Sequence, residues 1–163
     1  MSTDTPFAVH TALVKLIRSH YRLRWNGIHG YPHWVRVREN GLRLAERTGA
    51  RIDIIGLFAL FHDACRVNDG NDPPHGWRGA ELARSLCGTA FELDNPGLEL
   101  LADACARHTD GHLEGDITVQ TCWDADRLDL ARAGQTPRPE RLCTEAARDP
   151  QTLKWAVARS LQG

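Results

Sequence analysis

The sequence predicts an all-α protein, and three observations carry that prediction. Apolar residues recur at three- and four-residue spacing through most of the chain, as in helices that bury one face. No window alternates apolar and polar residues convincingly, which is the pattern of half-buried strands. Clusters of glycine, proline and asparagine separate the periodic segments and mark their ends. With 163 residues the chain is long enough to bury a core, and we expect one domain over 1–163.

The first three helices are predicted from periodicity and from helix-breaking residues. The first begins near Pro6 and repeats apolar residues at positions 9, 13, 16, 17 and 21. After two glycines, Pro32 suits the first turn of a second helix, which Thr48-Gly49 ends. The third helix spans about 52–65. Because its segment 52–61 is dense in apolar residues, we expect it to be buried.

A strong loop signal separates these helices from the remainder of the chain. Residues 68–74 (NDGNDPP) contain turn formers and two prolines but no apolar side chain. Five further helices are predicted at about 76–86, 96–107, 117–131, 138–147 and 150–161. No repeat, linker or low-complexity tract interrupts them, so the helices are expected to form one bundle.

The composition argues against several classes of protein. Twenty basic and 21 acidic residues leave a net charge of −1, so no global field favours nucleic acid or an anionic membrane. Arginine supplies 18 of the basic residues and binds phosphate bidentately, although an arginine-rich codon bias explains most of them more simply. Five scattered cysteines without a CxxC pair suit a reduced compartment. Without a signal-peptide pattern or an apolar run of roughly 20 residues, the protein is expected to be cytoplasmic.

The dipeptide His62-Asp63, at the end of the third helix, is the most informative feature of the sequence. Burying an imidazole and a carboxylate is costly unless a metal or hydrogen bonds satisfy them. This ligand pair suits iron, zinc, manganese or nickel. By itself the dipeptide could equally be two polar residues where a helix reaches solvent. The sequence has no glycine-rich phosphate loop, no GxSxG motif and no basic recognition helix that would indicate another class.

The chain carries a lone His33, then His62-Asp63, then a late Asp126 within the segment DADRLDL. This order resembles the HD superfamily of metal-dependent phosphohydrolases. The segments HGYPHWVRV and LFALFHDACR look like the family's first-ligand helix and its signature helix. The resemblance is strongest over 25–132 and implies an HD-domain helical bundle. It also implies a metal held by His33, His62, Asp63 and Asp126. Four ligands leave positions open for water, as a catalytic metal site requires.

Two residues close to these ligands in sequence are expected to have other roles. His29, four residues before His33, is the alternative first ligand. Because His29 lies in a glycine-flanked loop and His33 in a periodic helix, we prefer His33 as the ligand. Asp124 is two residues from Asp126 and therefore points away from it on a helix. We expect Asp124 to cap a helix or to orient an imidazole.

Two further histidines resemble features of binuclear HD proteins. His75 opens HGWRGAELA and His108 opens HTDG, a form that resembles the HD hydrolases that cleave dinucleoside tetraphosphates symmetrically. The resemblance implies a second metal on these two residues, with Asp63 bridging. Two departures are evident: His75 lies only 12 positions after Asp63, and Thr109 stands where the HD-GYP phosphodiesterases have another His. The alternative is that both imidazoles bind substrate phosphate beside a single metal.

Two arginines are predicted to contact substrate. Arg66 follows His62 by four residues, so it shares a helix face with His62 if the helix continues that far. There its guanidinium would bind a phosphate through two hydrogen bonds. Arg78, one turn after His75, is a second and weaker candidate.

The function implied is the hydrolysis of a phosphoester or phosphoanhydride, most simply in a nucleotide, by one or two divalent iron, zinc, manganese or nickel ions. Asp63 and Arg66 would be the catalytic residues. Two alternatives stay open: a dinucleoside-polyphosphate or cyclic-dinucleotide hydrolase, and a non-catalytic module that senses nucleotides. The expected partner is a small phosphorylated molecule, with no nucleic acid and no membrane. The sequence predicts no oligomeric state.

Overall fold

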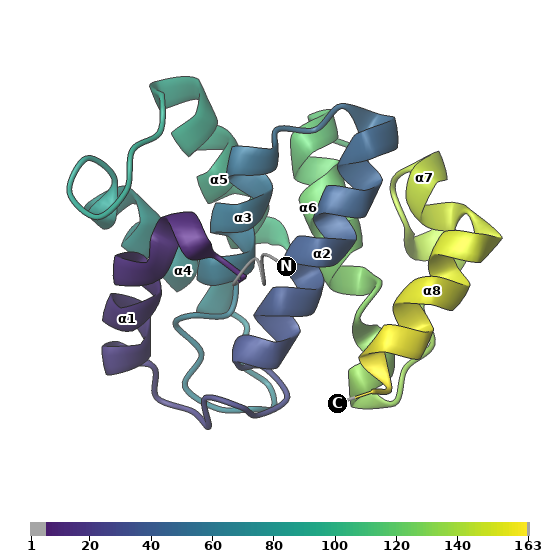
Figure 1. The fold of residues 1–163 in the computed structure, drawn as a ribbon, viewed down its shortest axis with the longest axis horizontal. Coiled ribbons are helices and arrows are strands. Elements are labelled where there is room, and N and C mark those ends of the chain that lie inside the picture. The colour runs from purple at the N-terminus through teal and green to yellow at the C-terminus, as the bar shows by residue number, and fades with distance from the viewer. Residues whose placement is uncertain (1–5, 163) are drawn as a thin grey trace, which may run out of the picture.

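The computed structural model describes residues 6–162, which form a bundle of helices (Figure 1). The α-helices are α1 (Thr11–His20), α2 (Tyr31–Thr48), α3 (Ile52–Phe61), α4 (His75–Leu86), α5 (Asn95–Arg107), α6 (Ile117–Arg127), α7 (Glu145–Arg148) and α8 (Pro150–Ser160). Three short 3₁₀ helices are η1 (Ala8–His10), η2 (Leu130–Ala133) and η3 (Pro139–Arg141). Over residues 6–162 the structure has no strand, only an isolated bridge, so the predicted all-α class is confirmed.

Helix α3 is the centre of the bundle. Every residue from Ile54 to Phe61 is buried, and α2, α4, α5 and α6 all contact this helix. A helix that is apolar on every side is stable in water only when neighbours cover it on every side. Burial of α3 therefore places the two residues after it, His62 and Asp63, in the interior of the protein.

Two glycines allow α4 to approach the ends of α3 and α5 closely. A Cβ atom on Gly79 would overlap the carbonyl oxygen of Phe61, and one on Gly76 would overlap that of Cys105. Only glycine permits such an approach of two backbones. The close packing brings His75, the first residue of α4, beside the carboxyl end of α3.

Four predicted helices differ from the structure. Helix α1 begins at Thr11 rather than near Pro6, after the 3₁₀ helix η1. Helix α3 ends at Phe61 rather than near Cys65, and the next four residues form turns. The predicted helix 117–131 is divided into α6 and η2, and the predicted helix 138–147 into η3 and α7. In the second case the carboxylate of buried Asp124 accepts hydrogen bonds from the backbone amides of Cys143 and Thr144, at 2.7 and 2.8 Å. These bonds compete with helical ones and hold Thr144 in an extended conformation.

The C-terminal helices α7 and α8, yellow in Figure 1, pack against each other and against α2. A second cluster of buried apolar side chains joins this layer to the bundle: Leu44, Leu128, Leu142, Ala146, Ala147 and Ala156. On the opposite side of the bundle, α1 is attached through Leu13 and Ile17, its two buried residues. In the part of the chain that the structure describes, no helix has the length and apolarity needed to cross a membrane.

Candidate metal centre

The structure brings together the four ligands predicted for a first metal. His33 lies near the start of α2, His62 and Asp63 follow α3, and Asp126 is in the last turn of α6. The Nε2 atoms of His33 and His62 are 3.0 Å apart. Each lies 3.6–3.7 Å from Oδ2 of Asp63 and 3.2–3.6 Å from Oδ1 of Asp126. A cation bound at about 2.0–2.2 Å leaves neighbouring ligand atoms roughly 3–3.5 Å apart, so these distances fit.

The other oxygen of Asp63 faces a second pair of imidazoles. Its Oδ1 atom lies 3.1 Å from Nε2 of His75 and 3.5 Å from Nε2 of His108. These two nitrogen atoms are also 3.0 Å apart. One buried carboxylate thus has a pair of imidazole nitrogens at each of its two oxygens.

The protonation of the four imidazoles follows from what their Nδ1 atoms contact. Each Nδ1 faces an oxygen that can only accept a hydrogen bond, and therefore carries the proton in the neutral ring. Each Nε2 then presents a lone pair to the cluster. Two unprotonated nitrogens 3.0 Å apart cannot hydrogen-bond to each other, and a cation would satisfy this donor set. The acceptors are the Asp129 carboxylate for His33 at 2.6 Å, the Phe58 and Ala59 carbonyls for His62 at 3.1 Å, the Asp72 carbonyl for His75 at 2.5 Å and the Cys105 carbonyl for His108 at 2.7 Å.

The electrostatics of the cluster also favour a cation. Without a metal, burial alone would raise the pKa of Asp63, but the positive charge of a protonated His62 and a hydrogen bond from His108 outweigh burial and hold this pKa well below its usual range. A bound cation would supply the same positive charge while the imidazoles are neutral. The pKa of Asp126 is lowered in the same way, burial being outweighed by His33 and His62. Two ionised carboxylates therefore lie beside the four Nε2 atoms.

Asp129 orients His33 and was missed in the sequence analysis. Its buried carboxylate also accepts hydrogen bonds from Arg36 at 2.8 Å and Ser160 at 2.6 Å. Asp124, expected to cap a helix or orient an imidazole, instead anchors the segment before α7. A signal for Asp129 exists in the sequence, because it follows Asp126 by three residues within the predicted helix 117–131 and would share a face with it there. In the structure Asp129 lies in the turn after α6.

His29 lies beside Asp63, in the loop that precedes α2. Its Nδ1 atom is 3.2 Å from Oδ2 of Asp63, and its Nε2 atom is 3.2 Å from the carbonyl of Asp69. His33, rather than His29, faces His62 across the cluster. The structure thus places His29 as a neighbour of the carboxylate, and the choice of His33 as the metal ligand stays a prediction.

A cavity of about 580 Å³ opens beside Asp63. Arg66 lines it, although α3 ends too early to place Arg66 on a helix face with His62. Its Nε donates to Oδ1 of Asp63 at 3.2 Å, and its Nη1 donates to carbonyls of the loop 68–70. Three further arginines that line the cavity escaped the sequence analysis: Arg132, Arg138 and Arg141. Arg127, next to Asp126 in sequence, also lines the cavity, and its guanidinium donates to the carbonyls of His112 and Arg141.

Arg78, the weaker candidate for a substrate contact, lies elsewhere. Its guanidinium pairs with the carboxylate of Asp72 at 2.6 Å and donates to the carbonyl of Cys65 at 3.0 Å. It lines a separate, mostly apolar cavity rather than the one beside Asp63. The spacing from His75 placed Arg78 on α4 correctly. Its guanidinium, however, is held by the carboxylate of Asp72, in the loop before that helix.

Comparisons with known proteins give two relatives, whereas no family model matches the chain. The chain is 28% identical over 146 residues to a curated protein of Halalkalibacterium halodurans named "Bis(5'-nucleosyl)-tetraphosphatase, symmetrical". The match covers 82% of this chain and 75% of the relative. The fold is similar to the crystal structure of a predicted HD superfamily hydrolase from an uncultured Thermotogales bacterium, with a TM-score of 0.70 and 26% identity. That match covers 93% of this chain and 86% of the other. Both relatives support a hydrolase.

Proposed function

We propose that this chain, whose fold and His, His-Asp, Asp pattern are those of the HD superfamily, is a metal-dependent phosphohydrolase that acts on a nucleotide. The observation that carries the proposal is the arrangement about Asp63, whose two oxygens each face a pair of imidazole nitrogens. This donor set opens onto a cavity lined by five arginines, and guanidinium groups bind phosphate well.

The proposed ligands of a first divalent cation are His33, His62, Asp63 and Asp126. A second cation would be held by His75 and His108, with Asp63 bridging. Imidazole and carboxylate groups suit iron, zinc, manganese and nickel alike. Bound divalent cations supply Lewis-acid activation of a phosphoryl group and of water.

The chain's own residues supply orientation and charge. Asp129 and the backbone carbonyls keep each imidazole turned toward the cluster. Arg66 contacts Asp63 directly and is therefore placed to offset negative charge on the phosphoryl group that is transferred. Arg132, Arg138 and Arg141 line the same cavity and would bind the remaining phosphates of the substrate.

A dinucleoside polyphosphate is the second candidate substrate, and the similarity to the symmetrical tetraphosphatase favours it. Arginines from several segments line the cavity, which suits a substrate with several phosphates. No comparable observation favours a cyclic dinucleotide. A non-catalytic sensor would not need a complete ligand set, so the six converging side chains favour an enzyme.

The test is a substrate screen with the protein loaded separately with iron, manganese, zinc or nickel. Nucleoside monophosphates, triphosphates, dinucleoside polyphosphates and cyclic dinucleotides are compared by phosphate release and chromatography. We expect turnover of a substrate with a phosphate chain and its loss in Asp63→Ala, with the helical circular dichroism retained. Asp103→Ala, which removes an exposed carboxylate from α5, is the matched control. Nucleotide binding without turnover by every metal form would overturn the proposal and indicate a sensor.

A further inference from the structure

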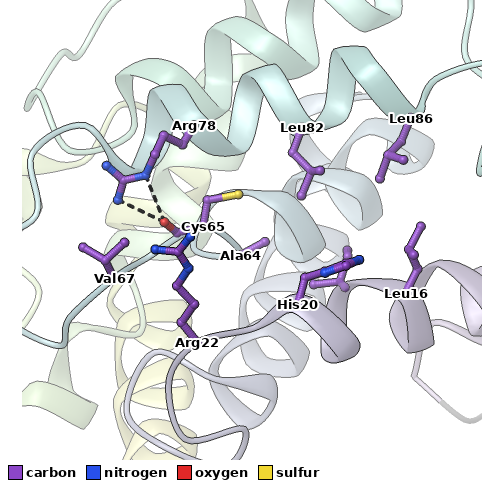
Figure 2. Close-up of a pocket in the computed structure, with 10 residues that line it drawn as sticks. Leu16, His20, Arg22, Ala64, Cys65, Val67, Arg78, Leu82 and Leu86 are labelled. Carbon is purple, nitrogen blue, oxygen red and sulfur yellow. Dashed lines mark hydrogen bonds between the residues drawn. The ribbon is translucent and has the colours of Figure 1, made fainter.

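A second cavity lies between α1, the turn after α3, and α4 (Figure 2). Its volume is about 400 Å³, within the range of small-molecule sites. None of the six proposed metal ligands lines it. The proposed phosphohydrolase activity makes no use of this cavity.

One end of this cavity is mainly apolar, with His20 of α1 as its polar lining residue. Figure 2 shows Leu16, from α1, close to Leu82 and Leu86, from α4. Leu16 is 37% exposed, and the two leucines of α4 are only partly buried at the edge of the core. These side chains therefore leave apolar surface in contact with water, and an apolar ligand would remove it.

The other end of the cavity is cationic. Figure 2 shows Arg22 and Arg78 together there, beside Cys65 and Val67. Arg78 is paired with the carboxylate of Asp72 at 2.6 Å. Arg22 is exposed and has no ion-pair partner within residues 6–162. Burial raises the pKa of the Cys65 thiol, while the positive charges of Arg78 and Arg22 oppose that rise, so both charges lie close to it. One guanidinium at this end is thus left uncompensated.

From this polarity we propose that the cavity binds a single-chain carboxylate, a fatty acid of medium length. Its carboxylate pairs with Arg22, and its alkyl chain lies along Leu16, Leu82 and Leu86. One uncompensated guanidinium matches a singly charged head group, and its two-pronged geometry matches a carboxylate. A recessed cavity takes a monomeric ligand, whereas binding to a lipid surface relies on a protruding amphipathic face.

Calorimetric titration of the full chain with laurate, kept below its critical micelle concentration, tests the proposal. We expect saturable binding of one laurate per chain. Arg22→Gln should weaken it about tenfold, the loss of one charge-assisted hydrogen-bonding group. Arg24→Gln, at an exposed arginine two residues away that does not line the cavity, is the matched control. Dodecanol, which lacks the carboxylate, should bind the wild type more weakly than laurate but should not discriminate between wild type and Arg22→Gln.

The apolar end is tested by Leu16→Gln, which should also weaken laurate binding. Its control is Leu161→Gln, at a 69% exposed leucine outside the cavity, which should leave binding unchanged. Circular dichroism verifies that each variant is folded. The proposal is overturned if laurate does not saturate the protein, or if Arg22→Gln and Leu16→Gln both bind like the wild type. Binding only to phosphatidylglycerol vesicles, and not to monomeric laurate, would also overturn it and indicate a membrane surface.

Discussion

The two pairs of imidazoles that face Asp63 are supported in different ways. The Nε2 atoms of His33 and His62 lie beside a second carboxylate, that of Asp126. The Nδ1 atom of His33 also contacts a third carboxylate, that of Asp129. Among residues 6–162, Asp63 supplies the only carboxylate within ion-pair distance of His75 and His108, and the Nδ1 atoms of both rings contact backbone carbonyls. More negative charge therefore surrounds the first pair than the second.

The second pair also depends on a loop. The carbonyl of Asp72 holds His75, while its carboxylate binds Arg78 and the backbone amide of Val67. The first pair, by contrast, is held by helices packed around α3. We expect the first proposed site to bind a divalent cation more tightly, and the second to exchange its cation more readily.

The largest effect is expected from Asp63→Asn, because this carboxylate is shared by both pairs. The substitution keeps the size of the side chain but removes the charge that serves the two proposed sites. Metal content, measured by plasma mass spectrometry after gel filtration, should fall from two ions per chain toward none, and hydrolysis should be lost. Two ions retained in the variant would contradict the bridging role.

His62→Gln and His75→Gln should separate the two sites. His75→Gln should lose the more weakly bound ion and keep the other, whereas His62→Gln should lose the tightly bound one. Titration with a chelator that competes for the metal would show this as loss of the low-affinity or of the high-affinity phase. If both variants lose the same phase, the two pairs are not independent sites.

A smaller effect is expected from Asp129→Asn, which leaves every proposed ligand in place. Because Asp129 orients His33, metal affinity at the first site should fall about 10–100-fold while the second site is unchanged. Asp124→Asn is the comparison, since Asp124 accepts hydrogen bonds from the Cys143 and Thr144 backbone instead. That variant should lower the free energy of unfolding by about 1–3 kcal/mol and leave metal affinity intact. Equal metal affinity in Asp129→Asn and wild type would contradict the role of Asp129 in orienting His33 for metal binding.

The smallest effect on the metal centre is expected from Arg66→Lys. The positive charge is kept but the two-pronged geometry is lost, so turnover should fall about 10–100-fold with little change in metal binding. Arg84→Lys, at an arginine of α4 paired with Glu99, is the control and should behave like the wild type. Wild-type turnover in Arg66→Lys would contradict a contact between Arg66 and the phosphoryl group, and would show that Arg66 only holds the loop 68–70.

Much of this arrangement could be predicted from sequence because it follows from helix order. The apolar density of α3 predicts its burial, and burial fixes the place of His62 and Asp63. The placement of His75 near Asp63 was implied by the family resemblance, whereas the need for Gly76 and Gly79 became evident only from the packing of α4. The convergence of these residues is now described by the structure, while their roles as metal ligands are proposals.

Other features depend on contacts between residues distant in sequence, and local patterns do not encode them. Ser160 reaches Asp129 from the last helix, and the arginines of 132–141 reach the cavity only because the segment 130–142 folds against it. The break between η3 and α7 arises from the buried carboxylate of Asp124, which overrides the local helical pattern. Apolar periodicity describes one helix at a time. It therefore predicts neither the contact of Ser160 with Asp129, nor the arginines of the cavity, nor the break before α7.

The central claim, that Asp63 bridges two cations between two pairs of imidazoles, is tested most directly by anomalous diffraction from crystals grown with manganese or iron. The account predicts two peaks on either side of Asp63, roughly 3.5–4 Å apart, one beside His33 and His62 and the other beside His75 and His108. A single peak held by His33, His62, Asp63 and Asp126, with the other pair binding no metal, would contradict it.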